Sequence, residues 1–249
     1  MRSFLAAFRF LTVLPVPEPW AGDPRHLARS VPYFPAVGLL IGALMALADC
    51  GLRWLLPLLP VSALVVIGMI AISGGLHLDG LADTADGMLS SRPKERILEI
   101  MKDSRTGAMG VAAVVCVVIL KIAALSTVPV SYRFATVLMM PLAGRCAIVL
   151  MMSVLRGARS EGSLTSLFRR SPLHVALAIG AVLMVGWFGS RWMGLTAGAL
   201  SLVTGLILTG YVRRKIGGFT GDTLGAACEL VEIVPALVAA SWAHGLIAP

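Results

Sequence analysis

Long apolar segments separated by short polar loops run through most of the 249 residues of this chain. A helix needs about 20 consecutive apolar residues to cross a bilayer. Segments near that length are residues 33–56, 61–78, 111–128, 136–155, 173–189, 194–212 and 224–247. Backbone groups inside a bilayer must find hydrogen bonds within the protein, so such segments fold as helices. The pattern therefore predicts an all-α, polytopic membrane bundle of about seven transmembrane helices.

Two short amphipathic segments outside these spans are expected to form interfacial helices. Near the N-terminus, one side of a short helix would carry Phe4, Leu5, Phe8 and Leu11. In the polar loop 87–110, an apolar stripe between Ile97 and Met101 follows Pro93, with Ser90 or Ser91 as a cap. Because no polar segment is long enough for a soluble domain, residues 1–249 are expected to form a single integral-membrane domain.

Charge and cysteine content constrain orientation and partners. Only 14% of the residues are charged and 57% are hydrophobic, yet the net charge is +8. Sixteen basic residues lie on the same side of the membrane as the N-terminus and three lie on the opposite side. This is the positive-inside pattern. This indicates a cytoplasmic N-terminus and attraction to anionic lipid or phosphorylated substrates, not to nucleic acid. The four cysteines are scattered singly, so neither a disulfide framework nor a zinc site is supported.

Residues 73–110 form the only long stretch that is dense in carboxylates. Asp79, Asp83 and Asp86 are spaced at i, i+4 and i+7, so a helix would place them within about 60° of one face. Bare carboxylates arranged this way repel one another, and hard oxygen ligands on a rigid element suit Mg²⁺. We therefore expect these aspartates to be catalytic and to bind metal. The alternative is a solvated acidic face at a helix end.

A second acidic stretch starts the last predicted span. Asp222 and Glu229 are seven residues apart and nearly in line on a helix, with Glu232 about 60° further round. The two glutamates fall inside an apolar span, where an ionisable group is unfavourable and indicates a functional site. The predicted spans offer Lys121 and Arg145 as cations. We expect at least one of them to pair with the glutamates or to face a substrate phosphate; a purely structural ion pair is the alternative.

Other polar residues near these stretches are candidate catalytic or substrate-binding groups. Lys102 and Arg105 could bind a phosphate, with a solvated loop as the alternative. His77 would point nearly opposite the aspartates on a helix, and is either a packed, hydrogen-bonded residue or a catalytic one. The remaining expected substrate contacts are Asp103, Arg145, Thr220, Gly221 and Thr223.

These motifs resemble the cobalamin (5′-phosphate) synthases, also called adenosylcobinamide-GDP ribazoletransferases. The similar stretches are, in order, FRFLTVLPVP, YFPAVGLLIG, GGLHLDGLADTADGMLSSR, RILEIMKDSRTGAMG and GGFTGDTLGAACELVE. The resemblance covers essentially the whole chain. It implies an Mg²⁺-dependent enzyme that joins adenosylcobinamide-GDP to α-ribazole or α-ribazole 5′-phosphate and releases GMP.

The resemblance also implies a mechanism at the cytoplasmic face of the inner membrane. Mg²⁺ would bridge the diphosphate and neutralise charge on the departing GMP. A ribose hydroxyl of ribazole would attack the phosphoryl group attached to the corrin, and a carboxylate or His77 would take its proton. Asp222 and Glu229 would complete the metal site of the three aspartates. A homo-oligomer and association with other corrin-pathway enzymes are two further hypotheses about partners.

Two other classes of protein are alternatives. A CDP-alcohol phosphotransferase of lipid synthesis would share the opening Asp83-Thr-Ala-Asp86-Gly87, but Ile100, Ser104 and Ala108 stand where that pattern needs its later Gly, Asp and Asp. A transporter could use the intramembrane charges as an ion path. Transporters commonly place their site near the midplane between repeats, whereas these carboxylates gather at one face and no internal repeat is visible.

Overall fold

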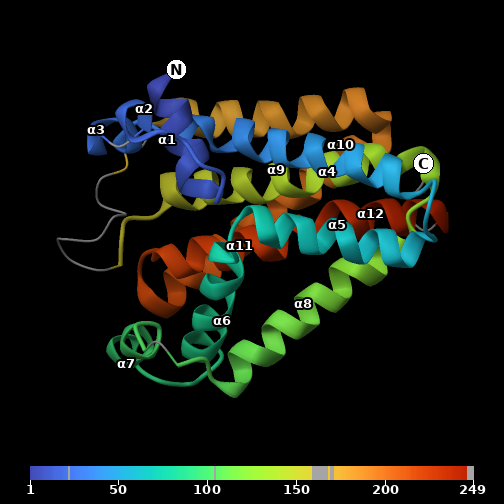
Figure 1. The fold of residues 1–249 in the computed structure, drawn as a ribbon. Coiled ribbons are helices and arrows are strands. Elements are labelled where there is room, and N and C mark those ends of the chain that lie inside the picture. Colours follow the sequence, from blue (N-terminus) through green and yellow to red (C-terminus); the bar gives the residue numbers. More distant parts are fainter. Residues whose placement is uncertain (22, 104, 159–167, 169–170, 246–249) are drawn as a thin grey trace.

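The computed structural model in Figure 1 describes residues 1–21, 23–103, 105–158, 168 and 171–245. These residues form helices and no strand, apart from one isolated bridge between Gly157 and Phe219. The all-α prediction is therefore confirmed. Positions 159–167, 169 and 170 of the predicted second polar loop, and 246–247 of the predicted last span, lie outside the described residues.

Within the described ranges, five helical segments are long and apolar enough to cross a membrane. They are α4 (Phe34–Leu52, after the turn η1, Val31–Tyr33), α8 (Ala108–Thr127), α9 (Val130–Val154), α10 (Pro172–Ile216), and α11 (Gly221–Glu232) with α12 (Val234–Ala243). The bent pair α5 (Leu58–Ile72) and α6 (Leu76–Met88) raises the number to six if it counts as one span. The chain is thus a polytopic helical membrane protein, and the number seven stays a prediction.

The long element α10 changes direction in its middle. Ser190 and Arg191 have non-helical dihedral angles. A Cβ added to Gly186 would clash with the backbone of Gly194, although a continuous helix would separate these residues by about 12 Å. α10 therefore folds back on itself as a hairpin of two helices. Its halves correspond to the predicted segments 173–189 and 194–212.

Helix α9 lies at the centre of the bundle, and α4 and α10 pack along it (Figure 1). Glycines bring α4 close to α9: a Cβ on Gly38 would lie only 2.6 Å from the carbonyl oxygen of Pro141, and Gly42 meets the backbone of Leu138. Small residues at such crossings let membrane helices approach backbone to backbone. The close contact explains why α9 has a mostly buried surface.

Short polar elements gather at one end of the bundle. Figure 1 shows these elements at its left end, with the C-terminus at the right end. They are α1 (Arg2–Leu11), α2 (Glu18–Ala21), α3 (Pro24–Ala28) and α7 (Lys94–Ile100). α1 and α7 occupy the places of the two predicted interfacial helices.

Helix α7 packs on the protein through part of its apolar stripe, because Ile97 and Met101 are both buried. The predicted cap by Ser90 or Ser91 is wrong. Pro93 occupies the N-cap position without a side-chain cap, and the Ser90 hydroxyl donates to the carbonyl oxygen of Gly87 instead.

A buried ion pair holds the bundle together away from the polar elements. Arg133 Nε donates to Asp49 Oδ1 at 2.7 Å, and its other nitrogens donate to Ser62 Oγ at 2.9 Å and the Leu125 carbonyl oxygen at 2.6 Å. Arg53 Nε lies 2.9 Å from Asp49 Oδ2. Arg133 is one of the three basic residues counted on the side of the membrane away from the N-terminus; it precedes the predicted span 136–155, whereas α9 already begins at Val130. The residue is fully buried within α9, where its donors find partners.

Candidate functional site

The aspartate motif begins a helix of its own. α5 ends at Ile72, α6 begins at Leu76, and the two helices are bent by 89° relative to each other. Gly74 and Gly75 lie between them with φ of 62° and 72°, a left-handed conformation that other residues rarely adopt. The predicted second span, 61–78, was therefore too long. The helical spacing expected for the aspartates is confirmed.

Helices α6 and α11 cross through glycine contacts. A Cβ on Gly80 would lie 2.8 Å from the carbonyl oxygen of Asp222, and a Cβ on Gly225 would lie 2.9 Å from that of His77. The two backbones therefore touch without intervening side chains. Because Asp79 precedes Gly80, this crossing brings Asp79 and Asp222 to the same place from widely separated parts of the chain.

The start of α11 is fixed by a capping box. Thr220 Oγ1 accepts from the N–H of Thr223 at 3.2 Å, and Thr223 Oγ1 accepts from the N–H of Thr220 at 2.9 Å. Thr220 Oγ1 also donates to Asp222 Oδ2 at 3.2 Å. Both threonines are buried. Their hydroxyls therefore orient Asp222 and the first turn of α11, and their predicted contact with substrate stays a prediction.

Asp79 and Asp222 line a pocket of about 190 Å³ between α1, α4, α6, α9 and α11. Gly221 and His77 line it as well. Asp79 also lines an open groove of about 670 Å³ beside α8, together with Thr106. One exposed carboxylate thus stands where an enclosed pocket and an open groove meet, which is a suitable position for joining two substrates.

A larger apolar cavity lies elsewhere, between α6, α8, α10 and α11. Its volume is about 310 Å³, and no carboxylate, lysine, arginine or histidine lines it. Without a carboxylate it lacks the oxygen ligands that Mg²⁺ prefers, so the candidate site is the smaller pocket beside Asp79.

The donors at this pocket suit a hard divalent cation. Asp79 and Asp222 provide carboxylate oxygens, and Asp83 follows Asp79 by one helical turn. Three or more His, Cys, Asp or Glu side chains do not converge on a metal-sized site anywhere in the described part of the chain. Mg²⁺ usually takes one or two protein carboxylates and completes its shell with water and substrate phosphates. The residues therefore fit Mg²⁺ without a closed protein cage.

Asp86 holds α6 to the start of α8. Its Oδ2 accepts from the N–H of Gly107 at 2.6 Å, and its Oδ1 accepts from the N–H of Gly110 at 2.9 Å. These N–H groups belong to the N-terminal end of α8, so the carboxylate caps that helix and complements its dipole. The structure shows a positioning role that the sequence had not indicated, and metal binding by Asp86 stays a prediction.

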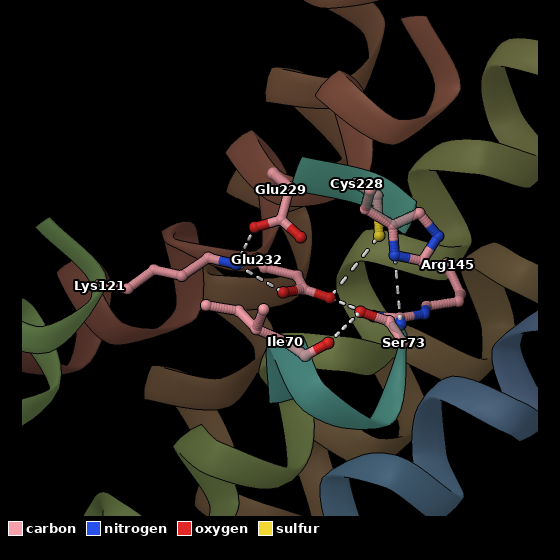
Figure 2. A network of polar contacts seen from close by, with 8 residues as sticks. Ile70, Ser73, Lys121, Arg145, Cys228, Glu229 and Glu232 are labelled. Carbon is pink, nitrogen blue, oxygen red and sulfur yellow. Dashed lines mark hydrogen bonds and ion pairs between the residues drawn. The ribbon is translucent and has the colours of Figure 1, made fainter. Parts of the chain in front are cut away.

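The buried glutamates of α11 form one network with cations from α8 and α9, shown in Figure 2. Lys121 Nζ donates to Glu229 Oε2 at 2.6 Å and to Glu232 Oε2 at 2.7 Å, and Arg145 NH1 donates to Glu232 Oε1. All four side chains are almost fully buried. The predicted pairing of these cations with the glutamates is confirmed. Neither Glu229 nor Arg145 lines the pocket, and metal binding by Glu229 and substrate binding by Arg145 stay predictions.

This network continues to His77. Arg145 NH2 lies 3.5 Å from His77 Nδ1. A guanidinium can only donate, so this contact makes Nδ1 the acceptor and leaves the hydrogen on Nε2. His77 is 3% exposed and lines the pocket. In this tautomer Nε2 is a hydrogen-bond donor, and a role for His77 as proton acceptor would require Nδ1 to leave Arg145.

The predicted phosphate contacts between α7 and α8 are exposed. Arg105 donates to the Asp103 carboxylate from Nε at 3.0 Å and from NH2 at 2.7 Å. These hydrogen bonds lower the pKa of the Asp103 carboxyl to about 2. Lys102 is also exposed, and Thr106, next to Arg105, lines the open groove. The loop thus lies at the rim of the groove, where its basic groups are accessible to an anionic ligand.

Substituting alanine for Gly80 is expected to lower the free energy of unfolding by about 1–3 kcal/mol, because a new methyl group would force α6 and α11 apart. Gly210→Ala on α10 is the matched control, since a Cβ there meets nothing within 4 Å. That control should be neutral, or stabilising by up to about 1 kcal/mol through helix propensity. Thermal unfolding of the detergent-solubilised variants measures both. Equal midpoints for the two would show that the crossing is not tightly packed.

The fold and the site together define a polytopic helical membrane protein that gathers carboxylates from two crossing helices beside a pocket at one end of the bundle. A family profile described as cobalamin-5-phosphate synthase matches residues 3–240. The chain therefore belongs to the cobalamin-5-phosphate synthase family.

Curated relatives agree with this assignment. A protein of Desulforamulus reducens is 39% identical over 235 residues, covering 92% of each chain. One of Stutzerimonas stutzeri is 39% identical over 233 residues (93% of this chain, 95% of the relative), and one of Escherichia coli K12 is 40% identical over 255 residues (94% and 97%). All three are named adenosylcobinamide-GDP ribazoletransferase. No solved structure matches this chain.

Proposed function

We propose that this protein is an adenosylcobinamide-GDP ribazoletransferase that acts late in cobalamin biosynthesis, during assembly of the nucleotide loop. It joins adenosylcobinamide-GDP to α-ribazole or α-ribazole 5′-phosphate, giving adenosylcobalamin or its phosphate, and releases GMP. The observation that carries this proposal is the match to the family over residues 3–240. Relatives that cover nearly the whole chain are named as transferases of this kind. The meeting of Asp79 and Asp222 between a pocket and a groove supplies the chemistry that such a reaction needs.

The reaction exchanges a phosphoanhydride bond for a phosphodiester bond. A ribose hydroxyl of ribazole attacks the phosphorus that is attached to the corrin, and the bond between that phosphorus and the oxygen of GMP breaks. The hydroxyl proton passes to a carboxylate or to water, and GMP leaves with the bonding electron pair. Asp79, at the junction of the two concavities, is the side chain best placed to orient the attacking hydroxyl against the phosphorus.

Asp79 and Asp222 would hold Mg²⁺, with water and substrate phosphates as its other ligands. When bound, the ion neutralises negative charge on the diphosphate and on the departing GMP. Thr220 supports this arrangement because its hydroxyl donates to Asp222 and holds the carboxylate in place. Lys102 and Arg105 at the rim of the groove would attract the phosphates of adenosylcobinamide-GDP.

The pocket would lie at the cytoplasmic face of the inner membrane. The positive-inside pattern supports this orientation, because it assigns the N-terminus and the loop of α7 to the cytoplasmic side. Adenosylcobinamide-GDP and Mg²⁺ would then reach the site from the cytoplasm, and the apolar helices would remain in the lipid bilayer.

Purified protein in detergent is expected to release GMP and to form the joined corrinoid when it is given adenosylcobinamide-GDP, α-ribazole and Mg²⁺. Removing divalent cations with EDTA should abolish the reaction, and added Mg²⁺ should restore it. High-performance liquid chromatography can follow both products. Activity on a CDP-alcohol, with no GMP release from adenosylcobinamide-GDP by well-folded protein, would overturn the assignment. Full activity in EDTA would overturn the proposed role of the metal but not the transferase assignment.

A further inference from the structure

We propose that the 190 Å³ pocket beside Asp79 binds the benzimidazole base of ribazole, and that the open groove on the other side of Asp79 receives the activated corrinoid. This inference rests on the proposed function and adds which substrate occupies which concavity. It follows from the aromatic lining, the size and the charge distribution of the pocket.

Part of the pocket lining is aromatic. Phe10, Phe34 and Phe168 all line it, and each ring contacts the other two, with centroids 5.7–6.1 Å apart. They come from α1, α4 and the segment before α10, so the fold assembles the cluster from three separate parts of the chain. Aromatic side chains bind a planar ring by offset stacking and edge contacts. Leu11 and Ile148 add apolar walls, which suit a benzimidazole better than a sugar or a phosphate.

The two concavities differ in size in the same way as the two substrates. Drug-sized ligands usually need pockets of at least about 300 Å³. The enclosed pocket, at about 190 Å³, can take a bicyclic base but not a corrin ring. The groove is larger, about 670 Å³, and open. Of the two concavities beside Asp79, the groove is the one with room for a bulky corrinoid and its diphosphate.

The carboxylates of the pocket can meet the ribose that follows the base. Asp79 and Asp222 line the pocket, and Asp79 lines the groove as well. A base stacked on the phenylalanines would place its ribose at these carboxylates, between the base and the phosphorus in the groove. This is the order of groups that the reaction requires: base, ribose hydroxyl, phosphorus.

The same lining predicts selectivity among bases. Among the pocket's lining residues, the polar side chains are His77 and the two aspartates, and the other lining residues are apolar side chains or glycines. A purine base would bring exocyclic polar groups and ring nitrogens against this mostly apolar lining, where they would lose hydrogen bonds to water without full replacement. The pocket should therefore prefer benzimidazole nucleosides to purine nucleosides with the same sugar.

Two substitutions test this placement. Phe10→Leu removes one aromatic face, and Ile148→Phe fills the pocket. Phe4→Leu is the matched control for the first, because Phe4 lies on the same helix α1 but does not line the pocket. The Michaelis constants for α-ribazole and for adenosylcobinamide-GDP are measured separately, together with kcat. Benzimidazole alone is also titrated as a competitive inhibitor and by direct calorimetric binding.

We expect Phe10→Leu to raise the KM for α-ribazole by about tenfold through lost ring contacts, with kcat and the KM for adenosylcobinamide-GDP nearly unchanged. Ile148→Phe should raise the same KM further and abolish benzimidazole binding. Phe4→Leu should resemble the wild type. If both pocket variants fold and keep the wild-type KM for α-ribazole, the base binds elsewhere. An inactive wild-type protein would instead overturn the proposed function, and the benzimidazole titration would still decide whether this pocket takes the base.

Discussion

Asp79→Asn is expected to lower the kcat of ribazole transfer by about 10²- to 10³-fold, the effect of losing several kcal/mol of metal-assisted charge stabilisation. Asparagine keeps the shape of the side chain but removes the negative charge that would attract Mg²⁺ to the junction of pocket and groove. The remaining activity should need more Mg²⁺ for its half-maximal rate, because Asp222 would then bind the ion without its neighbour. GMP release measured over a range of Mg²⁺ concentrations gives both quantities.

The Asp79 side chain is exposed, so this substitution should leave the thermal unfolding midpoint nearly unchanged. Glu99→Gln on α7 is a matched control, because it also removes one exposed negative charge at the polar end of the bundle. That variant should keep wild-type kcat and Mg²⁺ dependence. If Asp79→Asn were fully active at the same Mg²⁺ concentration, Asp79 would not be a metal ligand, although the transferase assignment would stand.

Local patterns in the sequence predicted much of this molecule. Apolar length predicted the membrane helices, and helical spacing predicted a common face for Asp79 and Asp83. The reasoning that buried Glu229 and Glu232 need a cation correctly predicted the network with Lys121 and Arg145. These successes share a cause, because hydropathy and helical periodicity act over one segment at a time, and unpaired charge inside a membrane is strongly unfavourable.

Features that depend on distant residues could not be predicted in this way. The bend after Ile72 was hidden because apolar residues continue to Leu78, although the pair Gly74-Gly75 could have indicated a break. The cap that Asp86 provides for α8 joins residues 21 and 24 positions apart, and a carboxylate pattern alone does not distinguish a cap from a metal ligand. The phenylalanine cluster and the buried Arg133 likewise depend on which helices become neighbours.

The network in Figure 2 leads to the largest expected effect on stability. Lys121 and Arg145 balance Glu229 and Glu232, so the buried group as a whole is neutral. Lys121→Met would leave one negative charge without a partner in the core. Removing one member of a buried pair typically destabilises a protein by about 3–5 kcal/mol. For a chain of this size, that corresponds to a thermal midpoint about 10 °C lower.

A second substitution distinguishes lost charge balance from lost packing. In Lys121→Met combined with Glu229→Gln, the remaining Arg145–Glu232 pair is neutral again, so most of the stability should return. Glu229→Gln alone leaves one excess positive charge and should destabilise, whereas Lys94→Met at the exposed start of α7 should have little effect. Thermal unfolding in detergent compares the four variants. If the double variant were as unstable as Lys121→Met, the lysine would stabilise the bundle through its own contacts. Recovery would show that charge neutrality in the core stabilises the bundle in which Asp79 and Asp222 are held.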